Sequence, residues 1–425
     1  MEVDISYGES TLRITLPNDS RARVLRGPRA PRLADPLSQI ESRLARPARS
    51  PALSALSRGR EQACVVISDN TRAVPNHLLL PAILEAIRPF VSRIRVLVAS
   101  GLHTPLHSDD LSALSNRCSL SDCEVIAHNA RDAQALATLG ETDGGVPVRL
   151  NRAYLDSDLR ILTGLVEPHF MAGYSGGRKS ICPGIAGAEL IQWIHSPQLL
   201  ESPRADYCIL QGNPVHEACV SIARKAEADF IVNLTINSEA KVSHVAAGEM
   251  EAAWMDCVKH VSKHAETAVH RPADIVITSN GGFPLDRNYY QAIKGLVSAA
   301  RVVRENGVII LAAECRDGLG GKAFRSGLRE LRDLNDLDAY IDHISSRDSY
   351  VDDQWEVEKL VHVLRKTRNL FILSDGLTAG EARLSFAESV SSVEEALSYA
   401  RSLVGANAGI LIMPQGPYLI PTLLA

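Results

Sequence analysis

The sequence Leu159-Arg-Ile-Leu-Thr-Gly-Leu-Val-Glu-Pro-His-Phe-Met-Ala-Gly-Tyr-Ser-Gly-Gly-Arg-Lys-Ser180 indicates the architecture of this chain. It opens with a short apolar run, Leu159 to Gly164, which is typical of a buried strand. A glycine-rich turn with a histidine and a lysine follows, and we expect a helix over 186–200. A strand, a polar loop and a helix in this order form the repeating unit of parallel α/β sheets. The loop is therefore expected at the carboxyl edge of such a sheet.

The same alternation of strands and helices runs through most of the chain. In the first part we predict strands at 63–68, 94–99, 124–127, 159–164, 229–236 and 241–247, with helices at 76–90, 108–116, 186–200, 213–228 and 249–264. After His270 the alternation restarts, with strands at 273–279, 308–313, 370–374 and 409–413, and helices at 286–306, 323–333, 355–367 and 391–404. This pattern predicts an α/β fold of two domains with mainly parallel sheets and an active site in the cleft between them.

We place an N-terminal, cofactor-binding domain at 1–270 and a C-terminal domain at 286–405 that contributes substrate-binding residues. The tail at about 411–425 is a candidate to return to the first domain. A length of 425 residues agrees with two domains, because it exceeds what one ordinary core supports.

Composition excludes several classes of partner. The net charge of −5 argues against a nucleic-acid partner and against general binding to membrane surfaces. The eight cysteines are scattered without a CxxC pair, which is typical of reduced thiols rather than of a disulfide framework. The purely apolar runs are far too short for a membrane span. We expect a cytoplasmic enzyme.

Polar clusters follow four of the expected strands. They are Ser68-Asp-Asn-Thr-Arg-Ala-Val-Pro75, Ser100-Gly-Leu-His-Thr-Pro-Leu-His107, the loop that starts at Glu167, and Asn280-Gly-Gly-Phe-Pro-Leu-Asp286. In open α/β sheets the ligand crevice lies beyond the carboxyl ends of the strands. The four loops could therefore line one cleft.

Histidines are the first candidates for chemistry in these loops. His103 and His107 have the four-residue spacing of a helical metal pair, but Pro105 between them argues against a helix. His169 leads directly into the glycine turn, which favours a role in proton transfer. His195 has an apolar helical neighbourhood, and this is typical of a core histidine.

The glycine loop is the second candidate. Gly173, Ser175, Gly176 and Gly177 could present backbone N–H groups to a phosphate, with Lys179 as a counter-charge or a nucleophile. The loop is not a Walker A motif, since Arg178 separates Gly177 from the lysine. The residues alone therefore indicate an anion site of some kind.

Five motifs in order resemble the nickel-dependent lactate racemase family. They are SDNTR at 68–72, SGLH at 100–103, EPH with AGYSGGRKS at 167–180, a histidine sixteen residues after the lysine, and YQAIK at 290–294. The resemblance extends over nearly the whole chain.

The resemblance implies a cofactor and a reaction. The cofactor is a nickel pincer nucleotide, Ni(II)-pyridinium-3,5-bisthiocarboxylate mononucleotide, joined to a lysine through one thioamide arm. By resemblance Lys179 is the attachment point and His195 the nickel ligand, so both belong to the metal site. His103 and His169 are the acid/base pair of a racemase or epimerase that inverts C2 of a 2-hydroxy acid by hydride transfer. Proteins of cofactor biosynthesis are then expected partners.

The resemblance also suggests which residues hold the small 2-hydroxy acid. Arg72 is placed at the substrate, and Asp69, Asn70 and Thr71 with it near the cofactor. In the second domain Tyr290, Gln291 and Lys294 look like substrate binders, the last two one helical turn apart. Thr104 stands where family members often have arginine, which leaves lactate or a larger analogue as the substrate.

Two other functions stay open from the residues. One is a zinc-type hydrolase that uses His103, His107 and His169. The other is a non-catalytic protein that binds a phosphorylated metabolite through the glycine loop.

Overall fold

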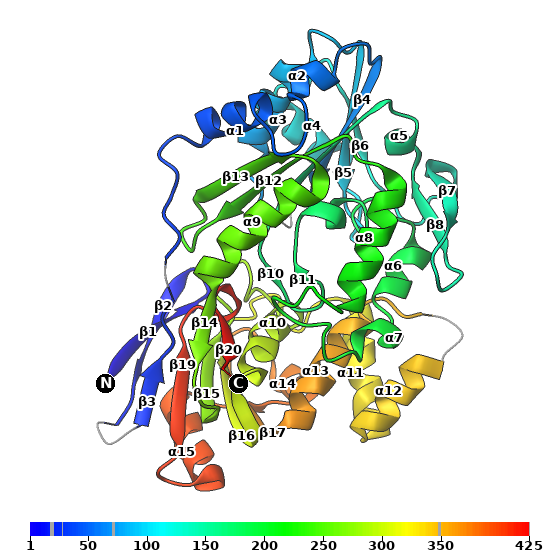
Figure 1. Ribbon diagram of the computed structural model, residues 1–425. Helices are drawn as coiled ribbons and strands as arrows, with labels where there is room; N and C mark the ends of the chain where they lie inside the picture. The colour runs from blue at the N-terminus through cyan, green and yellow to red at the C-terminus, as the bar shows by residue number, and fades with distance from the viewer. Residues whose placement is uncertain (18–20, 28, 70–72, 347–349, 425) are drawn as a thin grey trace. The chain divides into compact units, whose positions relative to one another are not determined.

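The computed structural model describes residues 1–17, 21–27, 29–69, 73–346 and 350–424 (Figure 1). The chain divides into two compact units. The Lys179 unit comprises Arg29–His195 and Ser202–Lys263. The Lys294 unit comprises Met1–Pro28, Ser196–Glu201 and His264–Ala425. Each unit has its own six-stranded sheet, which confirms the predicted fold of two α/β domains with mainly parallel sheets.

The sheet of the Lys179 unit has the strand order β13-β12-β9-β4-β5-β6. All neighbouring strands are parallel except the pair β12 and β13. The strand bounds are β4 Gln62–Ser68, β5 Arg93–Ala99, β6 Glu124–Ala127, β9 Leu159–Leu165, β12 Phe230–Ile236 and β13 Val242–Gly248. Residues Ala63 to Ile67 of β4 are at most 1% exposed, so this central strand is covered on both faces. The continuous apolar runs in the sequence are explained by this burial.

Helices cover this sheet. They are α1 Pro36–Ala45, α2 Leu53–Leu56, α3 Asn76–Ile87, α4 Ser108–Cys118, α5 Arg152–Leu155, α6 Ala188–Ile194, α8 Pro214–Ala226 and α9 Met250–Ala265. The single helix expected over 186–200 is wrong, because α6 ends at Ile194 and a separate α7 spans Pro197–Leu200. Pro197 has no N–H for a helical hydrogen bond, so it starts a new helix instead of continuing the old one. His195 thereby becomes the C-cap of α6.

Two short hairpins of the Lys179 unit were not expected from the sequence. One pairs β7 Leu136–Glu141 with β8 Pro147–Asn151, and the other pairs β10 Pro168–His169 with β11 Gly173–Tyr174. Strands this short have too few residues to show a clear alternation of apolar and polar positions. The second hairpin matters for function because it holds His169 opposite Gly173.

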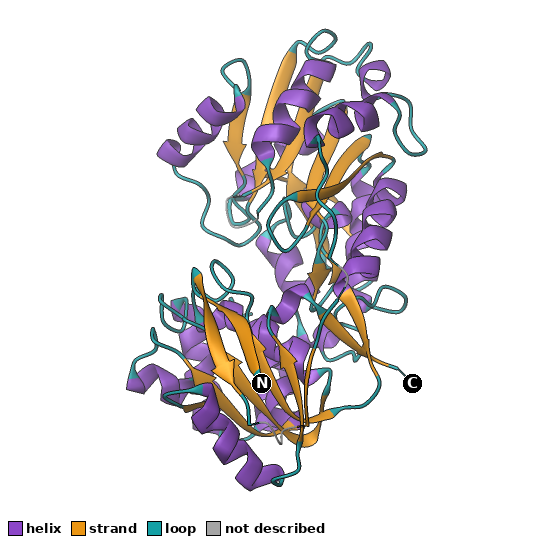
Figure 2. Cartoon of the chain, turned by 90° about the vertical axis from the view of Figure 1, so that its left-hand side faces the viewer, coloured by secondary structure: helices purple, strands orange, loops and turns teal. Residues whose placement is uncertain are grey.

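The sheet of the Lys294 unit has the order β18-β17-β16-β15-β19-β3, and every pairing is parallel. Its strands are β3 Arg21–Val24, β15 Ala273–Ser279, β16 Val303–Ala312, β17 Thr367–Leu373, β18 Glu388–Ser389 and β19 Gly409–Met413. Its helices are α10 Tyr289–Ala300, α11 Lys322–Leu334, α12 Leu337–Ser346, α13 Gln354–Lys366, α14 Ala379–Leu384 and α15 Val393–Val404. Figure 2 shows the strands in orange and the helices in purple. Helix α12 was not predicted.

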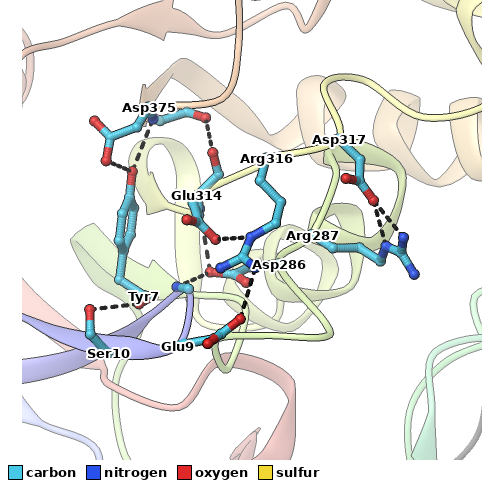
Figure 3. A network of polar contacts seen from close by, with 11 residues as sticks. Tyr7, Glu9, Ser10, Asp286, Arg287, Glu314, Arg316, Asp317 and Asp375 are labelled. Carbon is cyan, nitrogen blue, oxygen red and sulfur yellow. Dashed lines mark hydrogen bonds and ion pairs between the residues drawn. The ribbon is translucent and has the colours of Figure 1, made fainter.

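The N-terminal residues do not belong with the Lys179 unit, which corrects the expected domain 1–270. β3 pairs with β19 at the edge of the Lys294 sheet. The hairpin of β1 Glu2–Tyr7 and β2 Ser10–Thr15 is tied to the same unit by a polar network (Figure 3). In it the Tyr7 hydroxyl donates to Asp375 at 2.8 Å, and the Gly8 amide donates to Asp286 at 2.7 Å. Sequence patterns carry no information on such long-range partners.

The C-terminal tail also stays in the Lys294 unit. β20 Ile420–Leu423 pairs in parallel with β14 Glu266–Val269, and both strands belong to that unit. The expectation that the tail of about 411–425 returns to the first domain is therefore wrong. Within the described ranges no helix is long and apolar enough to cross a bilayer.

Candidate functional site

Three of the predicted loops leave the same edge of the Lys179 sheet. Asp69 follows β4, the His103 loop follows β5, and the Glu167 loop follows β9. The three strands are parallel neighbours in the order β9-β4-β5, so their carboxyl ends are adjacent. Chain order reverses between β4 and β9, and ligands of open α/β sheets bind at such a switch point. The fourth loop, at 280–286, follows β15 in the Lys294 unit.

His103 forms a hydrogen-bonded pair with Asp69. Its Nδ1 atom lies 2.8 Å from Asp69 Oδ2. The Asp69 side chain is 7% exposed, whereas the imidazole is 51% exposed. A carboxylate accepts only, so the ring proton of neutral His103 is on Nδ1 and the lone pair is on Nε2. This tautomer is suited to accept a proton from a ligand.

In His169 the Nδ1 atom is a hydrogen-bond acceptor, whereas in His103 it is a donor. The His169 Nδ1 atom accepts hydrogen bonds from the backbone amides of Met171 and Ala172, at 3.2 and 3.3 Å. The ring stacks on Phe170 with 5.3 Å between centroids. A nitrogen that accepts from two amides carries no proton, so neutral His169 holds its proton on Nε2. The two predicted acid/base histidines are thus held in different tautomers.

His195 is a buried, neutral imidazole close to Lys179. It is 8% exposed, and its Nδ1 lies 2.8 Å from the carbonyl of Ile191. Burial, together with the smaller effect of the positive charge of Lys179, lowers the pKa of His195 to about 3. The bond to Ile191 places the proton on Nδ1 and the lone pair on Nε2, as in histidines that bind metals. The structure therefore brings together the two residues predicted for the metal site.

Two thiols near Lys179 were not singled out from the sequence. Cys182 and Cys219 are buried and hydrogen-bond each other, and this bond lowers the pKa of Cys219. The charge of Lys179 acts in the same direction. Scattered cysteines gave no signal in the sequence, since their contact joins the loop after η2 Gly177–Ser180 to α8.

The glycines of the loop are explained by packing. Gly177 has a φ of +56°, and a Cβ there would lie 2.6 Å from Trp254 Cγ. Gly173 has a φ of +75°, and a Cβ there would lie 2.4 Å from the carbonyl oxygen of Ile209. Only glycine combines a positive φ with the absence of a Cβ, so only glycine fits these two positions without strain.

Two amides of the loop expected to cradle a phosphate, those of Ser175 and Gly177, have partners within the protein. The amide of Ser175 donates to the carbonyl of Glu167 at 2.9 Å. That of Gly177 donates to the side chain of Asn233 at 3.2 Å. Amides used in this way cannot also bind an anion. A phosphate site at this loop stays a prediction for the other residues, Gly173 and Gly176.

Arg178 and Trp254 hold this loop, and neither role was expected. Arg178 is 1% exposed, donates to the carbonyl of Ala172 at 2.7 Å and lies 4.1 Å from the centre of the Trp254 indole. Burial lowers the pKa of Arg178 to about 10. The indole N–H donates to the carbonyl of Ser175 at 2.8 Å. The arginine that interrupts the Walker pattern is therefore a structural residue that points inward.

The three predicted substrate residues of the Lys294 unit lie together on α10. The Lys294 ammonium donates to the Gln291 side chain at 2.5 Å. The Tyr290 hydroxyl accepts from the Trp355 indole at 3.2 Å. Burial raises the pKa of Glu356 to about 8, and the nearby charge of Lys294 opposes this shift. A lysine and an amide side by side can form the paired contacts that a carboxylate requires.

Four further predicted residues are Asn70, Thr71, Arg72 and His107. Asn70, Thr71 and Arg72 lie outside the described residues. His107 is exposed and precedes α4 as its N-cap. Among the described residues, the group of three or more side chains spaced for one metal ion does not include His103, His107 or His169. The zinc-hydrolase alternative therefore has no support in the structure.

These features define an α/β protein with a candidate site that contains histidine and lysine at the carboxyl edge of a parallel sheet. Residues 7–207 match the lactate racemase N-terminal domain, and residues 268–420 match the lactate racemase C-terminal domain. The chain is 32% identical over 424 residues to lactate racemase of Thermoanaerobacterium thermosaccharolyticum, covering 98% of each sequence. It belongs to the lactate racemase family.

Further comparisons with known proteins agree with this family assignment. Lactate racemase of Lactiplantibacillus plantarum is also 32% identical over 424 residues, covering 97% of this chain and 98% of that protein. The solved lactate racemase apoprotein from T. thermosaccharolyticum superposes with a TM-score of 0.92 over 99% of this chain and all of that one. A Thermotoga maritima protein of known crystal structure has a TM-score of 0.65 at 18% identity, covering 91% of this chain and 98% of that one, and shares the fold.

Proposed function

We propose that this protein is a racemase or epimerase that inverts C2 of a 2-hydroxy acid, either lactate or a larger analogue. The observation that carries this proposal is the pair of Lys179 and a neutral His195 in a protein of the lactate racemase family. Inversion requires that hydrogen leaves C2 from one face and returns to the other. A C–H next to a carboxylate is too weakly acidic for easy proton loss, so hydride transfer to a bound cofactor is the better route.

The residues fit a nickel pincer nucleotide. His195 offers a neutral imidazole with its lone pair on Nε2, and nitrogen of this kind suits nickel. Lys179 lies close enough for its charge to act on His195, and it would be the covalent tether. When bound, this cofactor supplies the hydride acceptor. Loading would depend on the proteins that synthesise it.

His103 and His169 would handle the hydroxyl proton. His103, with its lone pair on Nε2, would accept this proton as the hydroxyl carbon becomes a ketone carbon. Asp69 would stabilise the imidazolium that results. His169 would donate from Nε2 to the keto oxygen as hydrogen returns on the other face; as the acid it would be an imidazolium, so Nδ1 would carry a proton in that state and release the Met171 and Ala172 amides. Lys294 and Gln291 would bind the carboxylate of the substrate.

The test is intact-protein mass spectrometry with nickel analysis, on protein made in a host that synthesises the cofactor. We expect an added mass on the wild type and about one nickel per chain, both lost in Lys179→Ala. Lys241→Ala, which removes an exposed lysine from the same unit, should keep both. His195→Asn should keep the added mass and lose nickel during dialysis. An unmodified Lys179 in the wild type under these conditions would refute the proposal.

Racemisation of lactate and of longer 2-hydroxy acids by the loaded protein then identifies the substrate. A chiral separation of product from each pure enantiomer measures both directions. Loaded protein that inverts none of these acids would point to the non-catalytic alternative.

A further inference from the structure

Three side chains of the Lys294 unit form a second cluster of metal-ligand type. Glu201 follows α7, and Glu358 and His362 lie on α13. One ligand atom from each of the three lies within 4.8 Å of the others. Glu358 and His362 are four residues apart, so they project from one face of the helix. Neither the glycine loop nor the substrate residues on α10 belong to this cluster.

Glu358 is the unusual member. It is 0% exposed, and no N–H or O–H group of the described residues donates to either of its carboxylate oxygens. A buried carboxylate without donors is unfavourable unless it is protonated or bound to a cation. Burial raises the pKa of Glu358 to about 9, and the neighbouring Glu201 contributes to the increase. Its side-chain hydrogen-bond partner is thus another carboxylate, Glu201, and two adjacent carboxylates favour a shared proton or a bound cation.

The other two ligands point into the same space. His362 Nε2 contacts Glu201 Oε1. Burial lowers the pKa of His362, which favours the neutral imidazole that metal binding requires. Burial alone would raise the pKa of Glu201, but the hydrogen bond to His362 and the pairing with Arg365 lower it to about 2. An imidazole and a second carboxylate therefore lie beside Glu358, with one ligand atom from each within 4.8 Å of the others.

Two cations border the cluster without filling it. Arg365 Nη1 lies 3.0 Å from Glu201 Oε2, which leaves Oε1 of that carboxylate directed at His362. The Lys359 ammonium donates to the carbonyl of Leu200 at 3.3 Å. Both contacts hold the segment Ser196–Glu201 against α13. Their charges also weaken cation binding, so the affinity should be lower than that of an all-anionic site.

We propose that Glu201, Glu358 and His362 bind one divalent cation of the zinc type. Two carboxylates and one imidazole are a common ligand set for this ion, with water completing the coordination. The ion would replace the proton that Glu358 carries in its absence. It would fasten Ser196–Glu201, the segment directly after His195 in the sequence, to α13 of the same unit. This site is separate from the proposed nickel site and does not depend on it.

The test uses the full chain made in a host without the nickel cofactor pathway, treated with a chelator and dialysed. Zn²⁺ is titrated calorimetrically at pH 7 in two buffers of different ionisation enthalpy. The wild type should bind one equivalent and release protons, and Zn²⁺ should raise its melting temperature. Glu358→Gln and His362→Gln should each lose this equivalent and the shift in melting temperature.

The matched control is Glu356→Gln. Glu356 lies on the same helix, is 1% exposed and also has a buried oxygen without a partner, but it is outside the cluster. It should keep the zinc equivalent, and so should His195→Asn, which removes the proposed nickel ligand. No saturable binding by the wild type, equal binding by Glu358→Gln, or loss of binding in His195→Asn would overturn the proposal.

Discussion

His103 and Asp69 form a dyad at the carboxyl ends of β4 and β5, with 2.8 Å between Nδ1 and Oδ2. The carboxylate is nearly buried and the imidazole is half exposed, so the pair has one fixed partner and one that can reach a ligand. Such a pairing orients the ring and fixes its tautomer. Asp69, which was expected near the cofactor, is thus also a positioning residue for His103.

Replacing Asp69 with asparagine tests this dyad. Asp69→Asn keeps the shape but loses the negative charge, and the amide nitrogen can donate to Nδ1 and favour the other tautomer. We expect turnover to fall about 100-fold, within the usual contribution of general acid–base catalysis. Racemisation assays on protein with a verified cofactor adduct measure the effect. An unchanged rate would show that His103 does not need this carboxylate.

His195 should couple stability to pH. Its pKa is held at about 3 in the folded protein, whereas an unfolded imidazole titrates at about 6.5. The unfolded chain therefore binds a proton that the folded protein excludes. The contribution of neutral His195 to the free energy of unfolding is fully present above a pH of about 6.5. It is lost as the pH falls toward 3, by about 1.4 kcal/mol per pH unit.

The comparison between the wild type and His195→Asn isolates this effect, because the other buried histidines are common to both. Asparagine keeps an amide that can donate to the Ile191 carbonyl. Denaturant unfolding of cofactor-free protein at pH 7 and pH 5 should show the wild type losing about 2 kcal/mol more than the variant. Equal losses would mean that His195 is not held neutral by burial.

Gly177 should be intolerant of a side chain. Gly177→Ala combines a left-handed backbone with a clash against Trp254. Gly145→Ala is the matched control, since its φ is +74° but nothing lies within 4 Å of the added Cβ. The control should lose about 1 kcal/mol of unfolding free energy from backbone strain alone. We expect a further 1–3 kcal/mol, roughly, in Gly177→Ala. Equal losses in denaturant unfolding would contradict the close packing of this loop.

Lys294 should act in substrate binding. Lys294→Met keeps most of the side-chain volume and removes the charge beside Gln291. Loss of a charged hydrogen bond costs about 1.5–3 kcal/mol, so KM should rise about 10- to 100-fold. The cofactor adduct should be unchanged by mass spectrometry. Lys322→Met, an exposed lysine of the same unit, should leave KM as in the wild type.

Strand positions were predictable where burial is continuous. β6, β15 and β19 begin and end at the predicted residues, because their apolar runs are bounded by polar or turn-forming positions. The break between α6 and α7 was missed, because one helix was predicted over 186–200. Pro197 was a visible signal for this break. The sequence did not show that residues 1–28 and the C-terminal tail belong to the Lys294 unit. This assignment depends on the pairing of β3 with β19 and of β20 with β14, and these partners are far apart in the sequence.

For the site, polar loops after the strands pointed to Asp69, His103, His169 and Lys179, whereas His195 was proposed only through the resemblance to the lactate racemase family. The sequence contained no sign of the packing at Gly173 and Gly177, where Ile209 and Trp254 approach closely. It contained no signal for Arg178 as a buried support, or for Glu201 beside α13. Those roles depend on neighbours that are distant in the chain.

The amino-acid sequence was enough to establish two α/β domains and the lactate racemase family, since hydrophobic periodicity and ordered motifs are local properties of a chain. The tertiary structure was needed for the partners of each group: Asp69 with His103, Lys179 with His195, and Glu201 with Glu358 and His362. Protonation states and ligand sets follow from these contacts, because burial and nearby charges act through space rather than along the sequence.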